Sequence, residues 1–121
     1  MVKALLDTNI LVDFLNAIPQ AKAEIDRYRD RAVSIVTWIE VMVGAPGPAA
    51  AGTKDFLTSF EVIGLDRKIA ERAVSLRQTR RIKLPDAIIW ATAQETGSLL
   101  VTRNHKDFPD GDPSVRIPYD L

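Results

Sequence analysis

Short apolar runs alternate with stretches of helical periodicity along this chain. Five runs have the length and bounds of buried strands, at 2–6, 32–36, 61–65, 99–102 and 115–117. In the segments between them, apolar side chains recur every three or four residues, which predicts helices over 10–15, 20–30, 37–45, 56–60, 66–83 and 86–96. Gly and Pro concentrate in one stretch, 44–52, which predicts a loop.

Strands that alternate with helices indicate an α/β fold, with a short, mostly parallel sheet of four to five strands flanked by helices. The pattern contains no internal repeat and no linker, and 121 residues match the usual size of one domain. We therefore expect a single domain over 1–121. In parallel sheets, ligands bind beyond the carboxyl ends of the strands, so functional residues are expected at the junctions between strands and helices.

The composition narrows the chemistry. The chain has no Cys and one His, which excludes disulfides, a thiol nucleophile and Cys/His zinc sites. Any metal must then bind oxygen ligands, which suits Mg²⁺ or Mn²⁺. The 16 basic and 16 acidic residues cancel, and a zero net charge by itself argues against nucleic-acid binding. No apolar run approaches the roughly 20 residues that span a bilayer, so we expect a cytoplasmic protein without a membrane role.

Three acidic residues lie near junctions between predicted strands and helices. Asp7 directly follows the first strand, Glu40 lies in the helix after the second, and Asp86 opens the helix before the fourth. At one edge of a parallel sheet, such carboxylates raise each other's pKa values unless a cation neutralises them. The sequence therefore predicts a site for a divalent cation, which can activate water and stabilise charge on a phosphoryl oxygen.

Each acid also has a purely structural interpretation. Asp7 can cap the first helix, and Asp86 can complement the dipole of its own helix. Glu40 completes a T-W-I-E capping box that begins at Thr37, and taken alone this box favours a structural role. Three independent caps need not fall at one edge of a sheet, so the conjunction of the three favours a functional site.

Three segments together resemble a known family: LLDTNILVDFL near the start, SIVTWIEVMVG in the middle, and LPDAIIWATAQETGSLLVTRNHKDF near the end. In this order and spacing they closely resemble PIN-domain ribonucleases, and they are most similar to the VapC toxins of bacterial type II toxin–antitoxin pairs. The resemblance implies a PIN-like three-layer fold and an endoribonuclease that uses one or two Mg²⁺ or Mn²⁺ ions. It also implies an RNA substrate, a cognate antitoxin and a homodimer.

The resemblance further implies roles for individual residues. The catalytic, metal-binding acids would be Asp7, Glu40 and Asp86, and the residues that position the site would be Thr8, Asn9, Thr102 and Asn104. Many relatives carry an acid where this chain has Asn104, whose carbonyl can still coordinate a metal but adds no charge. Asp107 either compensates as a further metal ligand or only caps the next turn. The loop over 44–52 also departs from the family pattern, either at the rim of the site and the antitoxin contact or as a harmless insertion.

Basic residues gather in one part of the chain. From Asp66 to Lys83 there are seven basic residues and two acidic ones. Such a run is often only a solvated helix face, but its end approaches Asp86 in the sequence. We therefore expect phosphate contacts from Arg80, Arg81, Lys83 and, after the fourth strand, Arg103. Candidate apolar surface for an antitoxin lies on the first two helices, at Phe14, Leu15, Ile25 and Tyr28.

Two other classes of function compete with the nuclease. A phosphoacceptor receiver domain is also parallel α/β, but it needs paired acids after the first strand and an Asp at the end of the third. Here the third predicted strand ends in Gly64-Leu65-Asp66, a helix cap, and the paired acids are missing. A PIN-like module that binds RNA or protein without strong catalysis is the alternative that Asn104 leaves open, although the acidic triad argues against it.

Overall fold

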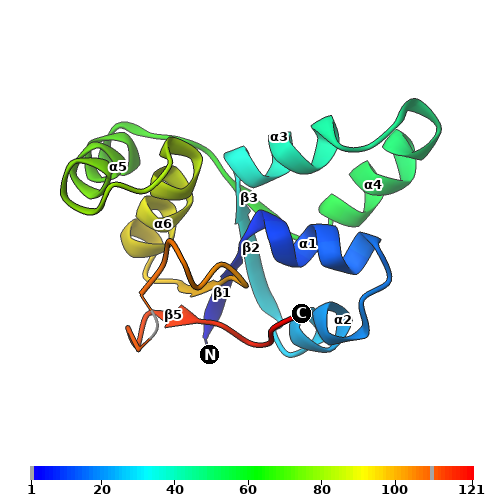
Figure 1. Cartoon of the computed structure of the whole chain (residues 1–121). Helices are drawn as coiled ribbons and strands as arrows, with labels where there is room; N and C mark the ends of the chain where they lie inside the picture. The colour runs from blue at the N-terminus through cyan, green and yellow to red at the C-terminus, as the bar shows by residue number, and fades with distance from the viewer. Residues whose placement is uncertain (1, 110) are drawn as a thin grey trace.

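A parallel sheet between two groups of helices organises the molecule (Figure 1). The computed structural model describes residues 2–109 and 111–121. The strands in this part of the chain are β1 (Lys3–Leu6), β2 (Asp30–Ser34), β3 (Glu61–Ile63), β4 (Leu99–Val101) and β5 (Val115–Arg116). The helices there are α1 (Thr8–Leu15), α2 (Pro19–Asp26), α3 (Ile35–Val43), α4 (Ala50–Leu57), α5 (Arg67–Arg80) and α6 (Leu84–Thr96), with a 3-10 turn at Gly47–Ala49.

The five strands lie in the order β3-β2-β1-β4-β5, and each neighbouring pair is parallel. This arrangement confirms the predicted α/β class. Leu6 at the end of β1 pairs with Val101 at the end of β4, and the amide of Asp7 donates to the carbonyl of Val101 at 2.9 Å. The residues that follow these two central strands therefore start from the same edge of the sheet.

The two faces of the sheet bury different helices because successive side chains of a strand point in opposite directions. From β1, Leu5 joins one core with α5 and α6, where Trp90 meets Phe108 edge-on at 5.5 Å between ring centroids. Ala4 and Leu6 join the other core with α1 to α4. Figure 1 shows the same division, with α5 and α6 on one side and α1 to α4 on the other. No helix among the described residues is both long and apolar enough to cross a membrane.

The start of α3 differs from the sequence prediction. The β-branched residues Ile35 and Val36 favour a strand over 32–36, but β2 ends at Ser34 and these two residues open the helix. The Ser34 hydroxyl accepts a hydrogen bond from the amide of Val36 at 3.0 Å, so Ser34 is the helix cap. Thr37 is then inside the first turn, and the predicted T-W-I-E capping box is wrong.

Three other segments also differ from the predictions. Helix α2 begins at Pro19, because Pro is well suited to a first helical position. It ends at Asp26, before the predicted end at residue 30. The predicted loop over 44–52 contains the 3-10 turn and the start of α4, since its alanines favour a helix. That helix covers Ala50–Leu57 instead of 56–60.

Ala17, between α1 and α2, allows a test of this backbone. It is exposed and has a φ of 62°, in the left-handed region that glycine adopts without cost. We expect Ala17→Gly to raise the free energy of unfolding by roughly 0.5–1 kcal/mol. The same change at Ala23, exposed inside α2, is expected to lower it by about 1 kcal/mol. Denaturant unfolding of both variants checks the two opposite signs, and equal losses of stability would contradict the assignment.

Candidate active site

Asp7 is at the centre of the site. It caps α1 directly after β1, and only 3% of it is exposed. Its carboxylate accepts hydrogen bonds from the amide of Thr8 (2.7 Å), the hydroxyl of Thr102 (2.7 Å) and the side-chain amide of Asn9 (3.3 Å). Burial raises the pKa of Asp7, the bonds from Thr102 and Thr8 lower it, and the nearby charge of Glu40 raises it further. The fold thus holds a carboxylate in one orientation in a place where its charge is costly.

Glu40 approaches Asp7 from α3. The hydroxyl of Thr8 donates to the Glu40 carboxylate at 2.6 Å and lies 3.0 Å from the hydroxyl of Thr37. Thr37 is fully buried. Since Ser34 caps the helix, Glu40 does not bond back to the helix start and its carboxylate is directed to Thr8 instead. Glu40, which taken alone looked structural, therefore lies beside Asp7.

Asp86 completes the group from the first turn of α6. It is partly exposed, and burial raises its pKa to about 6, with further contributions from the charges of Asp7, Asp107 and Glu40. The charge of Lys83 acts in the opposite direction. Carboxylates from three other segments of the chain are thus close enough for their charges to act on Asp86.

The turn after β4 is held by Asn104. Its side-chain oxygen accepts bonds from the amides of Lys106 and Asp107, both at 3.3 Å, and its side-chain nitrogen donates to the Asp107 carboxylate at 2.8 Å. The capping role in this turn thus belongs to Asn104, while Asp107 turns its carboxylate toward the other acids. An ionised acid at position 104 could not donate a hydrogen bond to the Asp107 carboxylate, whereas the side-chain amide of Asn104 can.

These side chains line an open cleft of about 430 Å³. The cleft residues are Asp7, Thr8, Asn9, Val12, Glu40, Lys83, Pro85, Asp86, Arg103, Asn104 and Asp107. The sequence-predicted acids and three of the four predicted positioning residues are thus together, while Thr102 is fully buried beneath them and bonds to Asp7.

The oxygen atoms in the cleft are of the chemical type that binds a hard divalent cation. They are carboxylate and amide oxygens whose repulsion a cation would relieve. No three of the carboxylates among the described residues gather tightly enough to form a ready-made metal cluster. Mg²⁺ usually keeps several waters and binds through only one or two carboxylates, so the arrangement matches that mode of binding rather than a closed protein cage.

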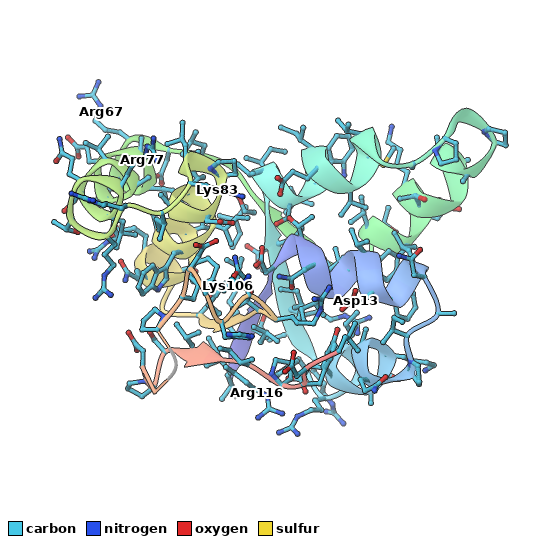
Figure 2. The ribbon with its side chains drawn as sticks, in the orientation of Figure 1. Asp13, Arg67, Arg77, Lys83, Lys106 and Arg116 are labelled. Carbon is cyan, nitrogen blue, oxygen red and sulfur yellow. The ribbon has the colours of Figure 1, made fainter. Side chains whose placement is uncertain are left out.

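The predicted RNA-contacting residues have different surroundings. Lys83 and Arg103 line the cleft, and Lys83 directly precedes α6 (Figure 2). The guanidinium of Arg80 instead lies 4.8 Å from the centroid of the Trp90 ring, and Arg81 ends α5 in a left-handed conformation. The Arg103 guanidinium forms an ion pair with Asp13, with 2.7 Å between Nε and Oδ2. Of the four, only Lys83 lines the cleft without such a contact among the described residues.

Sequence reasoning missed two residues beside the site. Asp13 lies on α1 and is 5% exposed, and Tyr119 in the C-terminal segment donates its hydroxyl to Asp13 at 2.8 Å. A charged residue within the apolar pattern ILVDFL was the available signal, because buried carboxylates almost always have a partner. Nothing local to the sequence identifies Tyr119 as that partner.

The apolar residues proposed as antitoxin surface are mostly not free. Ile25 is buried, and Phe14 and Tyr28 pack against the core beneath α1 and α2. Leu15 remains exposed, and together with Val12 and Val41 it lines a groove of about 350 Å³. Glu40 and Val12 line both this groove and the cleft, so the two hollows are next to each other.

Comparisons with known proteins identify relatives of this chain. The PIN domain family matches residues 4–112. A chain of "Toxin-antitoxin complex from Klebsiella pneumoniae" is 45% identical, with a TM-score of 0.93, over 98% of this chain and 100% of that one. No curated protein matches the chain.

Two more distant structures share the fold. A chain of FitAcB from Neisseria gonorrhoeae is 23% identical, with a TM-score of 0.82, over 98% of this chain and 99% of that one. A chain of VapBC2 from Rickettsia felis, bound to a DNA fragment from its promoter, is 24% identical, with a TM-score of 0.79, over 95% and 96%.

Proposed function

Because this chain belongs to the PIN domain family, we propose that it is a metal-dependent endoribonuclease and the toxin of a toxin–antitoxin pair. The observation that carries the proposal is the convergence of Asp7, Glu40, Asp86 and Asp107 on one open cleft. Structural roles alone do not account for this convergence, because Glu40 is not part of a helix cap and Asp86 has a raised pKa.

The proposed reaction is hydrolysis of an RNA phosphodiester. A water oxygen forms a bond to phosphorus, the bond from phosphorus to the 3′ oxygen breaks, and the products carry a 5′-phosphate and a 3′-hydroxyl. Mg²⁺ or Mn²⁺, one or two ions, would supply water activation and charge stabilisation when bound by Asp7, Glu40, Asp86 and Asp107.

The residues around the acids supply positioning and charge. Thr8 and Thr102 hold Asp7 and Glu40 in fixed orientations through hydrogen bonds of 2.6–2.7 Å. The ammonium group of Lys83 at the rim of the cleft can attract the RNA phosphate, as a flexible point charge. A side-chain nucleophile is not needed, because water is the attacking group.

An antitoxin partner is proposed from the likeness to a toxin–antitoxin complex. The groove lined by Val12, Leu15 and Val41 opens directly onto Glu40, so an apolar segment bound there would reach the acids. Blocking the cleft in this way accounts for inhibition without any change in fold. A homodimer remains part of the proposal through the family resemblance.

Cleavage of a mixed RNA pool by the purified chain tests the proposed function. We expect cleavage with Mn²⁺, loss of cleavage when a chelator is added in excess, and recovery when Mn²⁺ is restored. Cleavage that a chelator leaves unchanged would contradict the metal-dependent mechanism. Binding without cleavage of any RNA would instead support the alternative, a catalytically weak PIN-like binding module, which the amide of Asn104 in place of an acid leaves open.

A further inference from the structure

Arg103 is anchored to helix α1 at two points. Its Nε and Nη2 donate to the two carboxylate oxygens of Asp13, at 2.7 and 3.0 Å. Its backbone amide donates to the side-chain oxygen of Asn9 at 3.1 Å. Asn9 and Asp13 are four residues apart in α1 and therefore lie on one face of the helix. The residue that follows Thr102 is thus fixed against the same helix that Asp7 caps.

The C-terminal segment closes this cluster. The Tyr119 hydroxyl donates to Asp13 at 2.8 Å, so one buried carboxylate accepts both the fork of Arg103 and a phenol. In Figure 1 the C-terminal segment runs from β5 back toward α2, and Figure 2 shows Asp13 on α1 above this segment. We refer to Asp13, Arg103 and Tyr119 as the α1 clamp. A buried carboxylate with three such bonds holds its partners firmly, because losing one of them leaves part of its buried charge without a hydrogen-bond donor.

The residues on either side of Arg103 in the chain form hydrogen bonds that reach the acids. The amide of Asn104 donates to the Thr102 hydroxyl at 3.0 Å, and that hydroxyl donates to Asp7 at 2.7 Å. Asn104 then bonds to the Asp107 carboxylate at 2.8 Å. The backbone of residues 102–104 therefore links the placement of Asp7 to that of Asp107, and the Arg103 side chain, together with the bond from its amide to Asn9, holds this backbone to α1.

We propose that Arg103 is a positioning residue, which through Asp13 and Tyr119 sets the geometry of the carboxylates in the cleft rather than binding RNA. The proposal rests on the proposed nuclease function for its kinetic consequences, but not for its structural ones. Two of the three guanidinium nitrogens, Nε and Nη2, are bonded to Asp13, so the guanidinium cannot turn toward an RNA phosphate in the cleft without leaving the buried charge of Asp13 without its ion-pair partner.

The chain contains a second cluster of the same chemistry, which serves as a matched control. Arg116 donates from Nε and Nη2 to Glu24 at 2.7 and 3.0 Å, and the Tyr28 hydroxyl donates to Glu24 at 2.7 Å. Glu24 is 4% exposed, close to the 5% of Asp13. None of these three residues lines the cleft. The two clusters thus contribute comparable bonds to the fold, but only the α1 clamp is bonded to the site.

The experiment compares Arg103→Lys with Arg116→Lys, since lysine keeps the charge but cannot form the fork. With an RNA oligonucleotide and Mn²⁺, we expect Arg103→Lys to lower kcat by about 10–100-fold with KM nearly unchanged, and Arg116→Lys to leave kcat within about twofold. In metal-free protein, the amides of residues 103 and 104 are expected to exchange hydrogen about tenfold faster in Arg103→Lys only. If Arg103→Lys does not fold, Tyr119→Phe tests the same cluster, with a smaller change in the same direction.

Several outcomes would overturn the proposal. A raised KM with unchanged kcat in Arg103→Lys would show a phosphate contact instead of positioning. Equal losses of kcat in both variants would show a general loss of stability. Unchanged exchange at residues 103 and 104 would show that the fork does not hold this backbone. If the unmodified chain cleaves no RNA, the proposed function fails and the exchange comparison alone decides on the α1 clamp.

Discussion

Asp7→Asn is expected to lower the rate of Mn²⁺-dependent RNA cleavage by about a thousandfold or more, and to leave the fold intact. The change removes a negative charge from the centre of the cleft, so the proposed cation, which would supply several kcal/mol of charge stabilisation, would lose one of its anionic ligands. An asparagine oxygen can still accept the bond from the amide of Thr8. Because burial raises the pKa of Asp7, the neutral side chain is not expected to destabilise the protein. Initial rates on the RNA pool, together with thermal unfolding, measure both expectations.

The matched control for this variant is Asp55→Asn. Asp55 is exposed on α4 and lies outside the cleft, so the same chemical change is expected to leave the cleavage rate unaltered. Wild-type activity in Asp7→Asn would remove Asp7 from the mechanism. A loss of equal size in Asp55→Asn would show that overall charge, rather than the cleft, controls the rate.

Asp86→Asn is expected to lower the cleavage rate by a factor similar to that of Asp7→Asn. The same change is expected to stabilise the metal-free protein at pH 8. Folding raises the pKa of Asp86 from 3.8 to about 6. Between about pH 4 and about pH 6, Asp86 therefore keeps its proton in the folded protein and has lost it in the unfolded chain. The protein therefore loses stability through Asp86 as the pH rises from about 4 to about 6, and above pH 6 this loss does not grow further. We expect Asp86→Asn to raise the free energy of unfolding by about 1 kcal/mol at pH 8 and not to raise it near pH 4. The value at pH 8 is smaller than the pKa shift alone would give, because Asp86 is partly exposed and solvent screens its charge.

Unfolding in chelator across this pH range measures the effect. Asp112→Asn is the control of opposite sign, because hydrogen bonds from Ser114 lower the pKa of Asp112, and its removal is expected to decrease stability at pH 8. Added Mn²⁺ is expected to stabilise the unmodified protein more than Asp86→Asn. If Asp86→Asn changed the stability equally at pH 4 and pH 8, the cost inferred for the Asp86 charge, from burial first and from the neighbouring acids second, would be absent.

The sequence predicts the α/β order well because apolar runs and helical periodicity are local signals. Asp66 caps α5 and Gly97 ends α6, as expected, since both roles depend on neighbouring residues. The start of α3 was predicted wrongly because Ile35 and Val36 favour strands, whereas the cap at Ser34 and the packing of the helix decide the outcome. Local propensity does not contain the information that settles such a conflict.

The candidate site shows the same limit. That the acids share a cleft follows from parallel strands alone, so their convergence could be predicted without coordinates. Asp13 pairs with Arg103 and with Tyr119, which lie 90 and 106 positions further along the chain, and no local pattern signals such contacts. Arg103 therefore looked like a free cation in the sequence, although its guanidinium is engaged in the structure.

The zero net charge illustrates why placement matters more than totals. The acids gather in the cleft, while basic residues concentrate on α5 and at Lys83 beside it. Part of this basic group is used inside the protein, since Arg77 donates to the carbonyl of Ile82 at 2.6 Å and Arg80 covers Trp90. A balanced total thus conceals a cleft lined by four acids with Lys83 at its rim, which is compatible with RNA binding.

The central claim is that the carboxylates of the cleft support hydrolysis of RNA by water, and the chemistry of the product ends tests it most directly. The RNA pool is cleaved with Mn²⁺ in water enriched in heavy oxygen, and the fragments are examined by mass spectrometry. The mechanism predicts 3′-hydroxyl ends and 5′-phosphates that carry one heavy oxygen for each cut. Fragments that end in a 2′,3′-cyclic phosphate, with no heavy oxygen at the 5′ ends, would contradict it, because the attacking group would then be the RNA's own 2′-hydroxyl.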